Sequence, residues 1–260
     1  MADRREGGGL QSLDAALRVL RAMSVRAGPV SLSDLARDCA MPVSKVHRYL
    51  ASFLAAGLVA QEGRSGKYDL GPGAIRLGLA AIARNDFVNR AADGLPELAQ
   101  KTEMSTLLSI WGDHGATVIR WERARTPTVT SMGLGTTMPL LNSATGRAFL
   151  AWAPRAPLQS MLDLELRRAR GTRPLTPDLV PNRAGIDALV AGIREQGFAS
   201  VHGLFIPGLV ALAAPVLDWQ GEAQAVVTLI GTDPDTTNAG GAPSKSLVEF
   251  CRSLSFSLGD

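Results

Sequence analysis

Apolar residues recur every three or four positions in three successive stretches at the start of the chain, which is the period of an amphipathic helix. The first stretch covers 13–26, the second ends at Cys39, and the third covers 43–56. Two short extended stretches with glycines between them occupy 58–70, which predicts a β-hairpin. Three short helices followed by a hairpin are the content expected of a winged helix-turn-helix head.

Polar residues and glycine mark the expected ends of these helices. Ser12 can cap the first helix, and either Ser31 or Ser33 can cap the second. The tripeptide "AMP" at 40–42 turns the chain into the third helix, and Gly57 ends that helix. The connection between the second and third helices is therefore as short as a helix-turn-helix requires.

The third helix has two faces of different chemistry. At about 100° per residue, Val46, Leu50 and Phe53 fall on the side that would face a core. The other side carries hydrogen-bond donors suited to phosphates and base edges. The alternative for each of these residues, taken singly, is that it only lies on a solvated helix surface. The candidate DNA-binding residues are Ser33, Ser44, Lys45, His47 and Arg48, with Arg64 and Lys67 at the hairpin tip reaching the DNA backbone or minor groove.

The distribution of charge favours the same interpretation. Residues 1–70 hold ten Lys or Arg against seven Asp or Glu, whereas 71–260 hold seventeen of each. The whole formal charge of +3 therefore comes from the first quarter of the chain. A basic small domain ahead of a neutral larger one is expected of a polyanion-binding head on a different body.

Beyond the hairpin, a helical pattern from 74 to about 84 continues, with a bend near Asn85, to about 102. Further hairpins are expected at 105–122 and 210–231, together with a strand at 128–132 and helices over 143–153, 157–169, 183–197 and 244–257. Hairpins combined with helices predict an α+β fold with a mostly antiparallel sheet.

Several classes of function find little support in the residues. Cys39 and Cys251 are far apart and belong to no metal-binding cluster, so neither a disulfide framework nor a metal site is expected. No motif places a base against a nucleophile, and no catalytic residue or cofactor is predicted. The N-terminus lacks the apolar core of a signal peptide and no run of about 18 apolar residues exists, which favours the cytoplasm and no membrane partner.

The stretch "SLSDLARDCAMPVSKVHRYLASFLAAGLVAQEGRSGKYDLGPGAIRLG" resembles the winged head of IclR-type bacterial transcription regulators. Ser44, Arg48, Tyr68, Leu70 and Gly71 match the family pattern, whereas Lys45 stands where Thr is usual. Later stretches, "MPLLNSATGRAFLAW", "REQGFA" and "PGLVALAAPVLDWQGEAQAVVTLIG", also resemble the family, so the likeness spans about 10–258.

This resemblance implies a tail (1–9), a winged helix-turn-helix DNA-binding domain (10–71), a linker helix (72–88) and a GAF-like α/β effector-binding domain (89–260). It also implies a homodimer or homotetramer that binds a double-stranded, palindromic DNA operator. The alternative is a metabolite-binding or hydrolytic enzyme domain whose head mediates protein contacts only.

The resemblance further implies an effector pocket between 139–149 and the strands at 209–217 and 224–230. The chain departs from the family where Leu141 replaces a frequent His and where "VHGLFI" replaces acidic residues. Apolar replacements favour a mainly apolar effector, such as an aromatic acid, with its carboxylate on the backbone N–H groups at 143–145. The alternative is that these apolar residues simply fill the core. The candidate effector-binding residues, with His202 or Asn142 as the polar anchor, are Met132, Leu141, Asn142, Ser143, Ala144, Thr145, His202, Phe205, Leu209, Ala211, Thr228 and Ile230.

Overall fold

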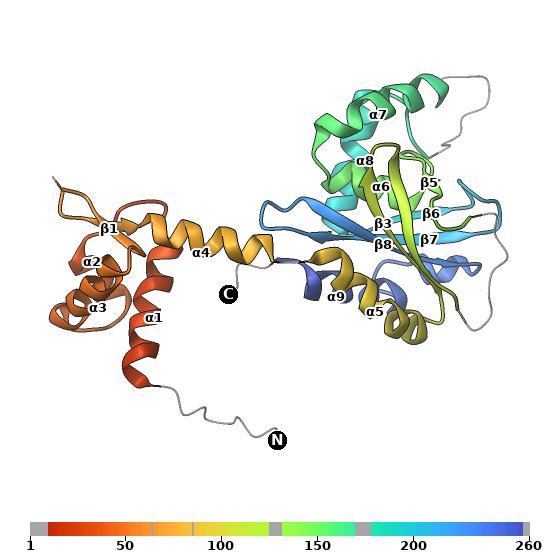
Figure 1. The fold of residues 1–260 in the computed structure, drawn as a ribbon. Helices are drawn as coiled ribbons and strands as arrows, with labels where there is room; N and C mark the ends of the chain where they lie inside the picture. Colours follow the sequence, from red (N-terminus) through yellow and green to blue (C-terminus); the bar gives the residue numbers. More distant parts are fainter. Residues whose placement is uncertain (1–9, 64, 85, 125–131, 170–177, 257–260) are drawn as a thin grey trace. The chain divides into compact units, whose positions relative to one another are not determined.

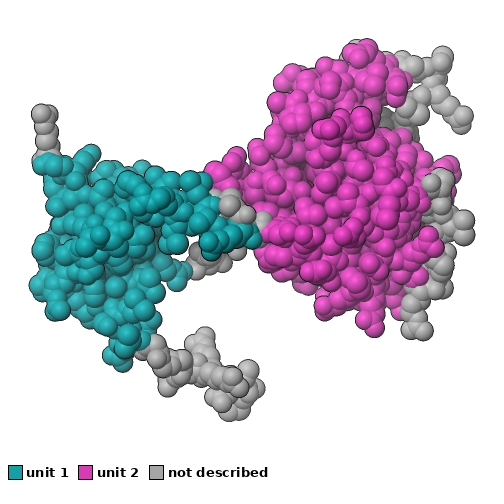
Figure 2. Space-filling model, in the orientation of Figure 1, with its two compact units in different colours: residues 1–85 teal, residues 86–260 magenta. Residues whose placement is uncertain are grey.

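The computed structural model describes residues 10–63, 65–84, 86–124, 132–169 and 178–256. The chain separates into two compact units, residues 1–85 and residues 86–260, which Figure 2 draws in two colours (Figure 1, Figure 2). Among the helices within the described ranges, none is long and apolar enough to cross a membrane.

The first unit contains the three helices and the hairpin that the hydrophobic pattern predicts, followed by one more helix. Its elements are α1 (Gln11–Ser24), α2 (Leu32–Asp38), α3 (Val43–Ala55), β1 (Val59–Gln61), β2 (Tyr68–Leu70) and α4 (Pro72–Ala83). The two strands pair antiparallel, and Val30 adds a bridge to Tyr68. The prediction of a helix-turn-helix with a β wing is confirmed.

The ends of these helices follow local hydrogen bonding. The Ser31 hydroxyl caps α2 by accepting from the backbone N–H of Asp34 at 3.2 Å. The prediction that Ser12 caps α1 is wrong, because the helix already begins at Gln11 and has no side-chain cap. The carbonyl of Leu10 accepts the backbone N–H groups of the first turn instead.

A small apolar core holds the first unit together. One side of each of α1, α2 and α3, one residue of each wing strand and Val30 are buried in it: Val19, Met23, Val30, Leu35, Ala36, Val46, Leu50, Val59 and Tyr68. Because Val46 and Leu50 anchor α3 in this core, the opposite side of α3 faces away from it.

The second unit is built on a six-stranded sheet in the order β5-β4-β3-β8-β7-β6, in which every neighbouring pair is antiparallel. The strands are β3 (Ser105–Gly112), β4 (Gly115–Glu122), β5 (Thr137–Met138), β6 (Ala199–His202), β7 (Val210–Leu217) and β8 (Ala223–Gly231). Both predicted hairpins, β3–β4 and β7–β8, are confirmed. The expected strand at 128–132 lies outside the described residues except for Met132, which is not in a strand.

Helices cover both faces of this sheet (Figure 1). They are α5 (Phe87–Thr102), α6 (Ala144–Trp152), α7 (Arg155–Ala169), α8 (Arg183–Gln196) and α9 (Ala242–Leu254), with a short 3₁₀ turn, η1 (Pro234–Thr237), before the last. The pattern over 74–102 therefore forms two helices, because the Asp86 side chain accepts from the backbone N–H of Asn89 at 3.0 Å and starts α5.

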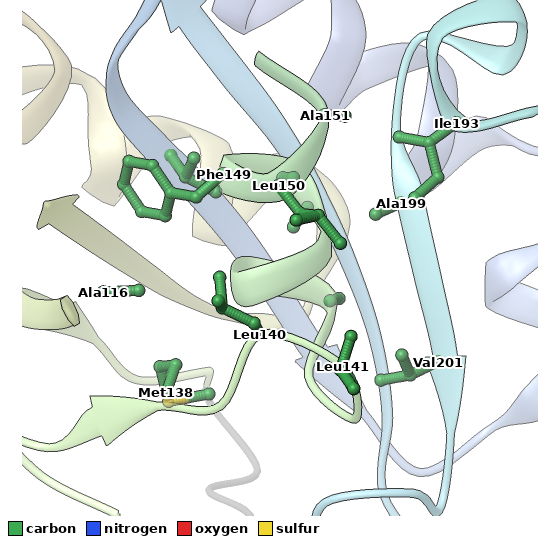
Figure 3. Packing of buried hydrophobic residues seen from close by; sticks show 14 of the residues in the cluster. Ala116, Met138, Leu140, Leu141, Phe149, Leu150, Ala151, Ile193, Ala199 and Val201 are labelled. Atoms are coloured by element: carbon green, nitrogen blue, oxygen red, sulfur yellow. The ribbon is translucent and has the colours of Figure 1, made fainter. Parts of the chain in front are cut away.

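Alternation along the strands divides the apolar residues between two cores. Leu107 belongs to the core under α6, whereas its neighbour Leu108 belongs to the core under α5 and α9. Figure 3 shows residues of the first of these cores, among them Phe149 and Leu150 of α6, Leu140 and Leu141 of the loop that precedes the helix, and Val201. The α+β fold with a mostly antiparallel sheet is confirmed.

Candidate DNA-binding face and effector cavity

The outward side of α3 carries the predicted DNA-binding side chains together. Ser44, Lys45, His47 and Arg48 are all exposed, while Val46 between them is buried. Exposed Ala51 continues this side without bulk, so a duplex backbone or groove could approach closely. Donors projecting from the N-terminal half of such a helix are what a recognition helix presents to base edges.

The turn before α3 is held by the backbone. Ala40 has a φ of +49°, and the N–H of Met41 donates to the carbonyl of Ala36 at 2.9 Å. This left-handed residue ends α2 and reverses the chain in the few residues that the motif allows. Ser33 is exposed on α2, where its hydroxyl lies 3.0 Å from that of Ser31.

The wing presents Lys67 beside a tight turn. Gly66 has a φ of +66°, which favours glycine, and its carbonyl accepts from Gln61 Nε2 at 3.0 Å. Lys67 is exposed directly before β2. Arg64, the other predicted wing contact, lies outside the described residues.

Tertiary packing brings two further basic residues to this part of the first unit. Arg18 and Arg21 of α1 are exposed and line, together with Lys45 of α3, a hollow of about 660 Å³. The sequence analysis named no residue of α1 as a DNA contact and missed them. The available signal was their spacing of three residues on the polar side of an amphipathic helix.

The predicted effector region contains a cavity of about 30 Å³ between the start of α6 and the sheet. It is lined by Met132, Met138, Ser143, Ala144, Thr145, Val201, Phe205, Ile206, Leu209, Ala211, Thr228 and Ile230. Met138, Val201 and Ile206 were not among the predicted residues. Val201 lies on β6, a four-residue strand that was not predicted because no turn residues mark it in the sequence. Pairing of β6 with β7 places Val201 at the cavity.

Hydrogen bonding fixes the start of α6 at the edge of this cavity. The Ser143 hydroxyl accepts from the Gly146 N–H at 2.9 Å and donates to the Pro139 carbonyl at 2.5 Å. The hydroxyls of Thr145 and Thr228 lie 2.8 Å apart and are buried. The first N–H groups of α6, those of Ala144 and Thr145, make no hydrogen bond within the described part of the chain.

Three predicted effector-binding residues lie elsewhere. His202 is exposed, and its Nε2 lies 2.7 Å from the Thr237 hydroxyl. Leu141 and Asn142 line a second cavity, on the far side of the loop that precedes α6. Neither predicted polar anchor therefore lines the first cavity.

Two ionisable side chains hold that loop by hydrogen bonds to its backbone. Glu165 of α7 accepts from the backbone N–H groups of Leu140 and Leu141 at 2.8 and 2.9 Å. Arg147 of α6, which is buried, donates from Nε to the Leu141 carbonyl at 2.7 Å and makes a bidentate pair with Asp178 at 2.6 and 2.9 Å. The loop is therefore held by one group that accepts from its N–H groups and another that donates to its carbonyl.

The pKa values of the two carboxylates are shifted in opposite directions. Burial raises the pKa of Glu165 above its usual value, despite the opposing hydrogen bonds from the loop. Burial also acts to raise the pKa of Asp178, but Arg147 outweighs it and the net pKa is lowered. Sequence reasoning missed the Arg147 contact, although an Arg among small and apolar residues in "SATGRAFLAW" signals a buried cation that needs a partner.

Gly146 explains how α6 can approach the loop so closely. A Cβ at this position would lie 1.9 Å from the Pro139 carbonyl oxygen and 2.6 Å from Leu140 Cα. Both neighbours are backbone atoms, so no side chain could move aside.

Among the described residues, no group of His, Cys, Asp or Glu is arranged to hold a metal ion.

A winged helix-turn-helix unit followed by an antiparallel α/β unit with an internal cavity defines a ligand-responsive class of transcriptional regulator. The IclR helix-turn-helix domain matches residues 12–63, and the bacterial transcriptional regulator IclR C-terminal domain matches residues 79–253. The chain belongs to the IclR family of bacterial transcriptional regulators. The resemblance noted in the sequence is confirmed.

Relatives match over nearly the whole chain. The HTH-type transcriptional regulator BhcR of Paracoccus denitrificans (strain Pd 1222) is 32% identical over 256 residues, which cover 97% of this chain and 89% of that protein. The glycerol operon regulatory protein of Streptomyces griseus is 27% identical over 243 residues, covering 94% and 92%. The crystal structure of Pseudomonas aeruginosa HmgR superposes with a TM-score of 0.78 at 34% identity, covering 95% of this chain and 97% of that one.

These comparisons bear on the two functional classes. Both family models and the relatives named above are of transcriptional regulators, so the enzyme alternative is not favoured. Regulators of this family bind DNA operators and small-molecule effectors, as the division into a helix-turn-helix head and an effector domain indicates.

Proposed function

We propose that the protein reads a palindromic operator with α3 and its wing, and that its second unit senses a small, mainly apolar organic acid of the aromatic class. The observation that carries the ligand class is the first cavity, in which apolar walls meet the N-terminus of α6. The exposed donors on α3 carry the DNA-binding part.

On the DNA, different residues have different roles. Arg48, on the outward side of α3, is positioned to contact a base edge or a nearby phosphate in the major groove. Lys67 of the wing, and Arg18 and Arg21 beside Lys45, are suited to phosphate contacts, which position the protein without reading sequence. Two heads related by a two-fold axis would place two α3 helices in successive major grooves.

Titration of the protein's own promoter DNA at several salt concentrations tests this assignment. Arg48→Ala should weaken binding of the specific site by about 1–3 kcal/mol, with much less effect on unrelated DNA. Lys67→Ala should weaken both DNAs alike and lower the log–log salt slope by about 1. Arg252→Ala, an exposed arginine of α9 in the second unit, serves as the control and should bind as the wild type does. If Arg48→Ala bound the operator with unchanged affinity, the proposal that α3 reads the operator would be wrong.

The chemistry of the first cavity favours an apolar body with one anionic end. A carboxylate near the N–H groups of Ala144 and Thr145 would gain hydrogen bonds and the positive end of the α6 dipole. Leu209 and Ile230 offer only apolar surface to the rest of the ligand. A very small polar acid would leave its other oxygens unpaired among such walls, which is costly.

Ligand entry requires the cavity to widen. A volume of about 30 Å³ holds a water molecule or two and no aromatic ring. On the inner side, Thr228 and Ile230 belong to β8, which pairs with strands on both edges. The outer side consists of half-buried residues outside helices and strands, such as Met132, Phe205 and Ile206. We expect this outer wall to move while the sheet keeps its place.

Calorimetric titration with a panel of aromatic and short aliphatic acids tests the ligand class. Aromatic acids should bind, and Ala211→Phe, which places a ring inside the cavity, should abolish their binding. Ala188→Phe, an exposed site on α8, adds the same ring away from the cavity and should leave binding unchanged. Tight binding of a two- or three-carbon keto acid, with no response to any aromatic acid, would show that the ligand class is wrong.

A further inference from the structure

A second and larger cavity lies between α7 and the loop that precedes α6. Its volume is about 290 Å³, against about 30 Å³ for the first cavity. Its walls are Thr137, Met138, Pro139, Leu141, Asn142, Met161, Leu164, Glu165, Arg168 and Ala169. Only Met138 lines both cavities, so the loop separates two distinct spaces.

The polar part of this second cavity is rich in hydrogen-bond acceptors. Each oxygen of Glu165 accepts one backbone N–H from the loop, which leaves acceptor capacity on both. Asn142 Oδ1 is buried and has no hydrogen-bond partner among the described residues. A buried acceptor without a donor costs free energy, and a ligand that donates would relieve that cost.

The charges around the cavity argue against an anion. Glu165 already has a raised pKa because burial disfavours its negative charge, and a second negative charge beside it would add repulsion. Arg168 is exposed to solvent, so its charge is screened more than that of Glu165. Met138, Leu141 and Met161 supply an apolar lining of adaptable shape.

We propose that the second cavity is a separate ligand site for a neutral, mainly apolar molecule with one hydrogen-bond donor, such as an alcohol. Its hydroxyl donates to Oδ1 of Asn142, the buried acceptor without a partner among the described residues, and its body lies against the methionine and leucine side chains. The two cavities then select opposite chemistry, because the first offers free N–H donors to an acid and the second offers acceptors to a donor. This site goes beyond the effector proposed above and does not depend on that effector's identity.

Methionine methyl groups report on the two cavities separately. Met161 lines only the second cavity and Met132 only the first. The full-length protein is labelled at its methionine methyl groups and followed by NMR during titration with cyclohexanol. The Met161 methyl signal should show a saturable chemical-shift change, and the Met132 methyl signal should not shift. Met161→Leu and Met132→Leu assign the signals. Cyclohexyl methyl ether, which has a similar body and no donor, should bind about 3–10-fold more weakly, as expected for the loss of one neutral hydrogen bond.

A matched pair of variants locates the site independently. Leu164 is partly exposed at the rim, so Leu164→Trp should block the cavity and abolish the Met161 shift without disturbing the core. Ser160→Trp places the same ring at an exposed position of α7 that does not line the cavity, and the shift should remain. The proposal is overturned if Met161 does not respond to millimolar cyclohexanol, if only Met132 responds, or if the ether binds as well as the alcohol. Each of these outcomes leaves the titration with aromatic acids unaffected.

Discussion

Two arginine–aspartate pairs in the second unit share their chemistry and differ in their surroundings. In the pair of Arg147 and Asp178, the side chains are 3% and 45% exposed. In the pair of Arg155 and Asp187, they are 69% and 49% exposed, with a single contact at 3.2 Å. A buried guanidinium cannot turn to water when its partner is removed, whereas an exposed one can.

We therefore predict unequal costs for the same substitution. Asp178→Asn should lower the free energy of unfolding by about 2–3 kcal/mol, below the full cost of a wholly buried pair because Asp178 is half-exposed. Asp187→Asn, the matched control, should cost no more than about 1 kcal/mol. Urea denaturation of the two variants measures both values. Equal losses would mean that the burial of Arg147 has no energetic consequence.

At acidic pH, the free energy of unfolding of Asp178→Asn should approach that of the wild type. Because the pKa of Asp178 is lowered in the folded protein, its charged form contributes stability at and above its usual pKa of 3.8. That contribution is lost as the pH falls through the lower folded pKa. Glu165 has the opposite sign, since its raised pKa favours folding of the protonated form and stability is lost as the pH rises through it.

At the scale of an element, α4 is apolar on more than one side. Ile75 and Leu79, one turn apart, are 61% and 59% exposed. Leu77, about 200° around the helix from Ile75, is 64% exposed. A helix that is apolar all round is normally buried. We propose that a second copy of the chain covers α4, which would also supply the second head for a palindromic operator.

Sedimentation at micromolar concentration tests this proposal. The wild type should be at least a dimer, and Leu77→Glu should shift it toward monomer because the interface would bury an unpaired charge. Arg76→Glu introduces the same side chain at an exposed polar position of the same helix and should change the association less. A wild type that sediments as a monomer would contradict the proposal.

The elements also show how far a periodic pattern can be trusted. Helices and hairpins with several apolar repeats between clear turn residues were predicted where they occur, as in α3 and the β7–β8 hairpin. The two edge strands, β5 and β6, have two and four residues and were not predicted. Alternation over so few positions has no statistical weight, and such strands form because a neighbouring strand offers its hydrogen bonds.

At the scale of the whole molecule, the residues proposed to bind DNA belong to the first unit and both cavities belong to the second. A ligand can change DNA binding only if it binds two states of the protein with different affinity. The loop between the cavities, held by Glu165 and Arg147, contributes a wall to both spaces. A shift of that loop would therefore let a ligand in one cavity change the affinity of the other cavity for its ligand.

The sequence by itself determined the class of fold and the outward side of α3, because helix periodicity, turn residues and charge are local properties that a chain displays without its partners. The family was indicated by the resemblance of several stretches of the sequence to a known family. Only the tertiary structure decided which residues share a space. Asn142 and His202 were predicted as alternative anchors of one pocket, yet the loop before α6 turns Asn142 into a second cavity and β6 ends with His202 at the surface. The direction of a loop side chain depends on contacts such as those of Glu165, which lies 24 and 25 residues from the loop residues that it holds and leaves no periodic trace in the sequence.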